Sequence, residues 1–384
     1  MQFEFATATR ILFGSGTLPQ AATSAKEMGR HILLITGSTA ERAEPLRQEL
    51  AKQSIETVPF AVSEEPTIDI VQRGTQLARS EHCDVVVGMG GGSVLDAGKA
   101  IAALLTNGGA PLDYLEVIGH GKSLTQPSAP FIAIPTTAGT GSEVTCNAVL
   151  GSPEHRTKVS LRSPGMFPRL AVIDPQLTLD LPRNITASTG LDALTQVLEP
   201  LVSKKANPLT DAICRAGLER IAQSLRPVYQ DGHNESARTK MALASLFGGL
   251  ALANAKLGAV HGFAGPFGGM FPAPHGATCA ALLPHVMEAN VLALNARQPD
   301  SPALQRYDEV AQVLTGNTQA TAMDGTNWVH QLCAELQVPP LRDYGLTEAE
   351  FPTLIDKATQ SSSMKGNPIE LTKSELVEIL QRAC

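Results

Sequence analysis

The sequence predicts two domains: an α/β domain with a parallel, Rossmann-like sheet in residues 1–183, and an all-α domain in residues 184–384. Three observations support this fold class. Short apolar segments alternate with amphipathic ones over the first 174 residues, which is typical of a parallel sheet with crossover helices. Gly-rich loops directly follow two of the apolar segments. Beyond residue 184 strand-like segments disappear, and long stretches rich in Ala, Leu, Glu and Arg predict helices.

The predicted sheet begins with an edge strand in residues 3–13, where aromatic and aliphatic residues alternate with smaller or polar ones. Short apolar runs then predict buried strands at residues 31–35, 57–62, 84–88, 131–134 and 170–173. Helices are expected between them at residues 18–28, 40–53, 68–80 and 94–105. Thr67 is a candidate N-cap for the third of these helices.

The second domain is expected to contain eight helices, at residues 190–203, 209–228, 236–256, 277–295, 307–314, 326–336, 348–358 and 373–383. His261 is expected to close one helical stretch and His275 to open the next. The Gly/Pro-rich segment between them, which includes Gly265 and Pro266, predicts a bend that brings the two imidazoles together.

Composition narrows the classes of function. The net charge of −7 and the lack of a dense Lys/Arg cluster argue against nucleic acid as a partner. The six cysteines are scattered without CxxC spacing, which favours reduced thiols and a cytoplasmic protein. There is no signal-peptide pattern, and no apolar run reaches membrane-spanning length, so no membrane association is expected.

The first chemistry-bearing loop joins a predicted strand to a helix and contains Gly90, Gly91, Gly92 and Ser93. Glycines allow close backbone approach to a phosphate, and the helix N-terminus offers free N–H groups. The loop therefore predicts a pyrophosphate site and makes the first domain a candidate dinucleotide-binding domain. Asp96 lies on the first turn of the helix and joins the cofactor candidates. The alternative is a glycine turn needed only for packing.

A second small-residue loop follows the strand at residues 131–134. Its Thr136, Thr137, Thr140 and Ser142 offer hydroxyl groups to a ribose or a phosphate. Both loops follow parallel strands, and ligands bind at the carboxyl ends of such strands. We therefore expect the two loops to bind one nucleotide.

The second domain supplies a candidate metal and catalytic site formed by Asp192, His261 and His275. One carboxylate and two imidazoles suit a divalent metal with an open coordination position. Gln196 lies four residues after Asp192 and thus on the same helix face.

Taken together, these stretches resemble the iron-containing (group III) alcohol dehydrogenases over nearly the whole chain. The motifs that carry the resemblance are residues 13–16, 90–99, 135–145, 173–175, 189–194, 274–276 and 283–286. The resemblance implies a dinucleotide-binding domain and a helical domain in the architecture of dehydroquinate synthase. It also implies NAD or NADP, a divalent metal, small alcohol or aldehyde substrates, and a homodimer or higher homo-oligomer. Asn147 and Lys158 match cofactor-contacting positions of the family.

Two metal-site positions depart from the family pattern. Gln196 stands where the family has a ligand His, so it is a candidate fourth ligand or a hydrogen-bond donor to the substrate. Gly265 stands where members commonly have a His that relays protons. Three protein ligands with water still suffice for catalytic zinc, so Zn²⁺ and Fe²⁺ both remain open. The loss of the imidazole at Gly265 predicts an enlarged pocket, bulkier or unusual substrates, and low activity on ethanol.

The cofactor preference also stays open. Many family members carry an Asp at the end of the strand that corresponds to residues 31–35, where it accepts hydrogen bonds from ribose hydroxyls. Gly37 and Ser38 occupy that neighbourhood here, and both would tolerate a 2′-phosphate. NADP is therefore as credible as NAD.

The main function that the resemblance implies is hydride transfer between alcohols and aldehydes or ketones. One alternative is a carbon–oxygen lyase of the dehydroquinate synthase type. The loop at residues 135–145 and the lack of a basic phosphate-binding cluster argue against it. Another alternative is a nucleotide-binding protein with impaired catalysis, suggested by Gln196 and Gly265. Maleylacetate reductases form a neighbouring branch whose second loop differs.

Overall fold

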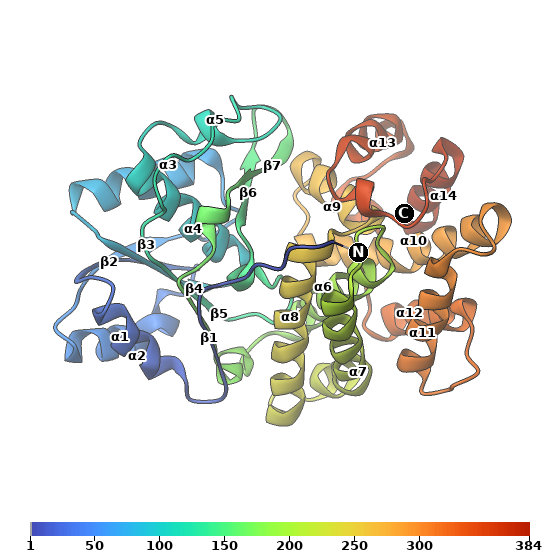
Figure 1. Ribbon diagram of the computed structural model, residues 1–384, viewed down its shortest axis with the longest axis horizontal. Coiled ribbons are helices and arrows are strands. Elements are labelled where there is room, and N and C mark those ends of the chain that lie inside the picture. The colour runs from blue at the N-terminus through green and yellow to red at the C-terminus, as the bar shows by residue number, and fades with distance from the viewer. Residues whose placement is uncertain (1) are drawn as a thin grey trace. The chain divides into compact units, whose positions relative to one another are not determined.

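A computed structural model describes residues 2–384 (Figure 1). The chain forms two compact units. The α/β unit comprises residues 6–137 and 141–179, and the helical unit comprises residues 2–5, 138–140 and 180–384. The domain boundary predicted after residue 183 falls at the start of the first long helix, α6, which begins at Arg183.

The α/β unit contains a six-stranded sheet in the order β1-β8-β5-β4-β2-β3, and every neighbouring pair is parallel. This confirms the predicted parallel sheet. The four inner strands carry almost uninterrupted apolar sequence because both faces of the sheet are covered. The strands are β1 (Ile11–Phe13), β2 (His31–Thr36), β3 (Glu56–Ala61), β4 (Val85–Gly90), β5 (Phe131–Pro135) and β8 (Leu170–Ile173).

Helices cover both faces of this sheet (Figure 1). Helices α1 (Leu18–Lys26) and α2 (Glu44–Lys52) pack on one face, against Ile32 and Leu34. Helices α3 (Ile68–Ser80) and α4 (Gly92–Asn107) pack on the other face, against Leu33 and Ile35. Alternate residues of β2 thus serve opposite cores. Shorter helical segments are η1 (Ala40–Ala43), α5 (Pro111–Tyr114), η2 (Ser142–Val144), η3 (Pro164–Met166) and η4 (Pro175–Thr178).

The structure confirms one local prediction for this unit and corrects another. The Thr67 side chain accepts a hydrogen bond from the Ile70 amide, so the predicted cap is confirmed. The strand expected over residues 3–13 is wrong in its first part, because only Ile11–Phe13 pair, with residues 171–173 of β8. Residues 3–5 alternate in polarity but have no partner strand among the described residues, and Phe3 is 48% exposed.

An antiparallel hairpin, not expected from the sequence, follows the second loop. It consists of β6 (Asn147–Ser152) and β7 (Thr157–Arg162). Ala148 and Leu150 point into the same core as Val159 and Leu161. Only β7 carries this period of two in its sequence, as Lys-Val-Ser-Leu-Arg, whereas β6 has three consecutive apolar residues at 148–150.

The helical unit confirms the predicted all-α second half. Its helices are α6 (Arg183–Val202), α7 (Pro208–Gln230), α8 (Glu235–Ala255), α9 (Ala259–Met270), α10 (His275–Arg297), α11 (Pro302–Thr315), α12 (Ala322–Glu335), α13 (Phe351–Gln360) and α14 (Lys373–Ala383). Short 3₁₀ segments are η5 (Leu341–Tyr344), η6 (Glu348–Glu350) and η7 (Met364–Gly366). Helix α10 is long and apolar enough to span a membrane, but most of it is buried among the other helices of this unit.

One prediction about this half is wrong in part. The bend predicted between the two histidines is confined to residues 271–274, which include Pro272, because Gly265 and Pro266 lie in the middle of α9. His261 is the third residue of that helix instead of the end of one. Val260, Phe263, Ala264 and Phe267 are buried at helical spacing, so packing of this face outweighs the Gly/Pro turn preference. The sharp turn of 98° lies earlier, between α8 and α9.

Candidate functional site

The site in the helical unit is organised around Asp192, a fully buried residue in the middle of α6. Its Oδ1 atom accepts no hydrogen bond. It lies 3.4 Å from Nε2 of His261 and 3.8 Å from Nε2 of His275. Burial disfavours the carboxylate, but the imidazoles of His275 and His261 outweigh it and lower the pKa of Asp192. A buried anionic oxygen therefore faces two imidazole nitrogens.

His261 is held by a second carboxylate, that of Glu199. Glu199 Oε2 lies 2.8 Å from Nδ1 of His261, and Glu199 Oε1 accepts a hydrogen bond from the Val260 backbone amide at 2.7 Å. A carboxylate only accepts, so Nδ1 of His261 must carry the proton. In the neutral ring, Nε2 then presents its lone pair toward Asp192. Glu199 thus fixes both the tautomer and the direction of the ring.

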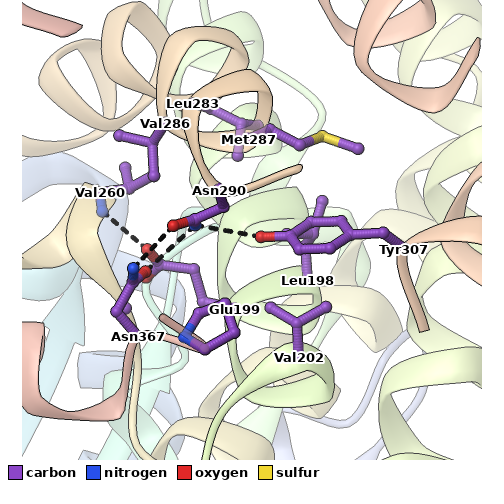
Figure 2. Close-up of a pocket in the computed structure, with 12 residues that line it drawn as sticks. Leu198, Glu199, Val202, Val260, Leu283, Val286, Met287, Asn290, Tyr307 and Asn367 are labelled. Atoms are coloured by element: carbon purple, nitrogen blue, oxygen red, sulfur yellow. Dashed lines mark hydrogen bonds between the residues drawn. The ribbon is translucent and has the colours of Figure 1, made fainter. Parts of the chain in front are cut away.

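A buried network of polar side chains binds the backbone N–H groups at the start of α9 (Figure 2). The Asn367 side-chain oxygen accepts hydrogen bonds from the Ala259 backbone amide and from the Asn290 side-chain amide, both at 3.1 Å. The Asn290 side chain also donates a hydrogen bond to the Tyr307 hydroxyl. With the Glu199 bond to Val260, these contacts satisfy the first two N–H groups of α9, which lack partners within the helix. The cavity beside this network has a volume of about 10 Å³, room for one water. His261 is therefore placed by a rigid support.

His275 is the first residue of α10, as predicted, and its side chain is 34% exposed. Its ring centroid lies 5.4 Å from that of His261. Burial opposes protonation, but Cys279 and Asp192 raise the pKa of His275 to about 9. Among the donors gathered here, His275 is the one that is open on one side.

Cys279 completes the cluster one turn further along α10. Its sulfur lies 3.7 Å from Nε2 of His275 and 3.8 Å from Nε2 of His261, and the residue is fully buried. The ligand atoms of Asp192, His261, His275 and Cys279 all lie within 4.8 Å of one another. The predicted trio therefore converges, and a thiol joins it.

Two functional residues were missed by the sequence analysis. Both had a signal in helical spacing: Glu199 lies seven residues after Asp192 on one face of α6, and Cys279 lies four residues after His275 on α10. The sequence predicts reduced thiols and assigns them no role at the site, although a His and a Cys four residues apart on a helix share one face.

Gln196 is buried next to Asp192 on α6. Its amide is a hydrogen-bond partner of the Asp192 carboxylate and contributes to lowering the pKa of Asp192. Its oxygen has no hydrogen-bond partner, and it lies 3.6 Å from the position that a Cβ on Gly248 of α8 would occupy. The amide nitrogen is thus the Gln196 atom suited to face the carboxylate.

In the α/β unit the first predicted loop lies where expected. Gly90 ends β4, Gly91 caps α4, and Gly92 and Ser93 are the first residues of that helix. A Cβ on Gly91 would lie 3.4 Å from the Thr137 side chain, so the two predicted loops lie side by side. The N-terminus of α4 can therefore bind a phosphate between small side chains.

The second loop is anchored to α4 by Asp96 and Lys99. Asp96 accepts hydrogen bonds from the Ser142 hydroxyl and from the Val149 amide. Buried Lys99 lies 3.1 Å from Asp96 and donates to the Ser142 carbonyl at 3.0 Å and to Thr145 at 2.8 Å. Both Asp96 oxygens thus serve the protein itself, and this side chain shapes the loop.

The other cofactor candidates occupy varied places. Thr136 is buried directly after β5, and Thr140 lies in the short part of the loop that belongs to the helical unit. Gly37 and Ser38 follow β2, and the position of a Cβ on Gly37 is surrounded by open space. Asn147 begins β6, while Lys158 in β7 forms an ion pair with Glu65 at 3.4 Å.

Comparison with known proteins assigns both units to one family. Residues 8–175 match the family model for iron-containing alcohol dehydrogenase, and residues 186–384 match the C-terminal model of the same family. The chain is 37% identical to alcohol dehydrogenase 4 of Schizosaccharomyces pombe, covering 97% of this chain and 87% of the relative. It is also 37% identical to 1,3-propanediol dehydrogenase of Citrobacter freundii, covering 87% and 85%.

Solved structures agree with this assignment. A 1,3-propanediol oxidoreductase superposes with a TM-score of 0.92 at 32% identity, covering 100% of both chains. Sulfoacetaldehyde reductase from Bifidobacterium kashiwanohense, solved in complex with NAD⁺, superposes with a TM-score of 0.85 at 30% identity, covering 99% and 98%. The chain belongs to the iron-containing alcohol dehydrogenase family.

Proposed function

We propose that this protein interconverts alcohols and aldehydes or ketones by hydride transfer to and from NAD or NADP, with a divalent metal held by Asp192, His261 and His275. The oxidoreductase class follows from membership of the family. The observation that supports the metal site is the buried Asp192 oxygen, which has no hydrogen-bond partner and faces two imidazole nitrogens. Such a donor set fits a borderline divalent cation, either Zn²⁺ or Fe²⁺.

A divalent cation at these residues would lower the pKa of an alcohol bound beside it and would polarise the carbonyl in the reverse direction. The protein's own residues prepare the site for this role. Glu199 keeps the Nδ1 proton on His261 and the Nε2 lone pair free. Asp192 contributes negative charge in a buried setting, where electrostatic interactions are strong. His275, at 34% exposure, marks the side from which a substrate can approach.

The cofactor is proposed to bind at the two loops of the α/β unit. Its pyrophosphate would lie at the N-terminus of α4, over Gly91 and Gly92. The end of β2 carries Gly37 and Ser38 in place of a carboxylate, so neither of these two residues would repel a 2′-phosphate. We therefore propose that NADPH is accepted as well as NADH. The nicotinamide itself carries the hydride chemistry.

The substrate pocket is proposed to be wide near Gly265. A Cβ at this position of α9 would have no atom within 4 Å, so the missing side chain leaves open space. Without an imidazole there, proton transfer passes to water or a hydroxyl chain. The named activities of the relatives, on alcohols, 1,3-propanediol and sulfoacetaldehyde, support a substrate among alcohols and aldehydes. The open pocket favours members larger than ethanol.

Two further expectations belong to this proposal. The protein is proposed to be cytoplasmic, in keeping with six cysteines that form no disulfide. It is proposed to be a homodimer or higher homo-oligomer, with the β1 edge of the sheet available for pairing. The lyase alternative is not favoured, because the relatives are dehydrogenases.

The test is a reductase screen with purified protein loaded with Zn²⁺ or Fe²⁺. Aldehydes of increasing size are offered with NADH and with NADPH, and the Asp192→Asn variant is the control. We expect metal-dependent oxidation of the cofactor with larger aldehydes and none in the variant. Full activity in the presence of a strong chelator, or preferred turnover of ethanol, would contradict the proposal. Inactivity on every aldehyde would favour a nucleotide-binding protein with impaired catalysis.

A further inference from the structure

The donor cluster of the helical unit contains one more ligand atom than the predicted trio. The sulfur of Cys279 lies at similar distances from both imidazole Nε2 atoms, 3.8 Å for His261 and 3.7 Å for His275. Asp192 Oδ1 lies 3.4 Å and 3.8 Å from the same two nitrogens. The sulfur and the carboxylate oxygen therefore each lie close to both imidazoles.

These separations are close to those between ligands of one tetrahedral ion. Zinc bonds are about 2.0–2.1 Å to nitrogen or oxygen and about 2.3 Å to sulfur. At the tetrahedral angle they separate nitrogen from oxygen by about 3.3 Å and nitrogen from sulfur by about 3.6 Å. The four observed values exceed these by about 0.1–0.5 Å, and the other two pairs of donor atoms lie within 4.8 Å of each other.

The orientation of the polar atoms also fits a bound cation. Asp192 Oδ1 is buried without a hydrogen-bond partner and lies 3.4 Å from Nε2 of His261. Glu199 contacts Nδ1 of the same ring, which leaves Nε2 directed at Asp192 and at the sulfur of Cys279. A divalent cation would bind all four donor atoms at once.

Gln196, the other candidate for the fourth position, is less well placed. Its amide group faces the Asp192 carboxylate as a hydrogen-bond partner, and this role needs the nitrogen atom. Its oxygen lies beside Gly248 of α8. Gln196 is therefore suited to orient Asp192, whereas the sulfur of Cys279 is the further donor atom that lies close to both imidazoles.

We propose that Cys279 is a metal ligand, and that the ion held by Asp192, His261, His275 and Cys279 is zinc in preference to iron. Thiolate donors favour Zn²⁺, whereas sites of oxygen and nitrogen donors discriminate less against Fe²⁺. Four protein ligands leave room for a substrate oxygen only as a fifth ligand, an expansion that zinc accepts. The partly exposed side of His275 is where this oxygen would enter. The inference rests on the proposed function for its catalytic meaning but not for its test.

The decisive experiment needs no variant. X-ray absorption at the zinc edge of the purified zinc-loaded enzyme should show one sulfur neighbour at about 2.3 Å beside nitrogen and oxygen neighbours at about 2.0–2.1 Å. A shell of nitrogen and oxygen alone would overturn the proposal. This readout is independent of turnover. An active enzyme without the sulfur shell refutes the inference alone, and an inactive one with it refutes only the proposed function.

Cobalt substitution adds a test by mutation. The Co²⁺-loaded enzyme should show a thiolate-to-cobalt charge-transfer band in the near ultraviolet. The Cys279→Ser variant should lose this band and bind Zn²⁺ at least about tenfold more weakly, since even residues that only support ligands change affinity by that factor. Cys333→Ser, which alters another buried thiol of the same unit, should keep both. A band that survives in Cys279→Ser, or disappears in Cys333→Ser instead, would contradict the assignment.

Discussion

Replacing Glu199 by Gln tests whether this buried carboxylate sets the metal affinity through His261. Glu199 accepts two hydrogen bonds, from the Val260 amide at 2.7 Å and from His261 Nδ1 at 2.8 Å. Glutamine has one acceptor oxygen, so its NH₂ group must face one of these two donors. If the oxygen stays on Val260, the imidazole has to move its proton to Nε2 and loses the lone pair that faces Asp192.

The expected effects follow from these contacts. One charge-assisted hydrogen bond is lost and a buried donor is left unpaired, so the free energy of unfolding should fall by about 1.5–3 kcal/mol. Metal affinity should fall by about 10–100-fold, as for other residues that orient a ligand histidine. That loss corresponds to about 1.4–2.7 kcal/mol of binding free energy.

The assay combines urea unfolding with competition between the protein and a chelator for Zn²⁺. The Glu219→Gln variant makes the same chemical change on the exposed face of α7 and serves as the control. A folded Glu199→Gln variant with unchanged metal affinity would refute the idea that Glu199 fixes the His261 tautomer. If the Glu199→Gln variant lost stability but kept its metal affinity, the role of Glu199 would be limited to stabilising the start of α9.

Three other predictions follow from the structure. Gly265→His should fold normally, because its side chain enters open space, and should lower kcat/KM for bulky aldehydes relative to small ones by about tenfold; an unchanged ratio would argue against a pocket there. Lys99→Met should lower the free energy of unfolding by about 3–5 kcal/mol, because the substitution leaves the Asp96 carboxylate without the buried ammonium group that pairs with it. The variant should also bind the cofactor more weakly. An unaltered midpoint of urea unfolding would contradict this prediction. Burial raises the pKa of Glu143 from 4.5 to about 7, so the charged form costs stability as pH rises from 4.5 through 7, by about 3 kcal/mol in full. Glu143→Gln should therefore be more stable than the unmodified protein at pH 8 and similar at pH 4.5, and a stability difference that is independent of pH would disprove this.

Much of the fold was predictable because its signals are local. The inner strands are short apolar runs, and the helices of the second half have long apolar periodicity, so both were recognisable from sequence. The hairpin of β6 and β7 was missed, because only β7 alternates between apolar and polar residues and it does so over only a few residues. The segment around Pro266 was predicted to bend but is helical, because the burial of Phe263 and Phe267 outweighs the local turn preference of Gly and Pro.

The site divides in the same way. The sequence by itself predicted the Gly-rich loop after β4, which is proposed to bind a phosphate, and the trio of Asp192, His261 and His275, because these depend on residue types and on short spacings along the chain. Only the tertiary structure showed that Glu199 orients His261 and that the sulfur of Cys279 meets both imidazoles. These contacts join α6, α9 and α10, and their distances depend on how three helices pack, which no local pattern of residues specifies.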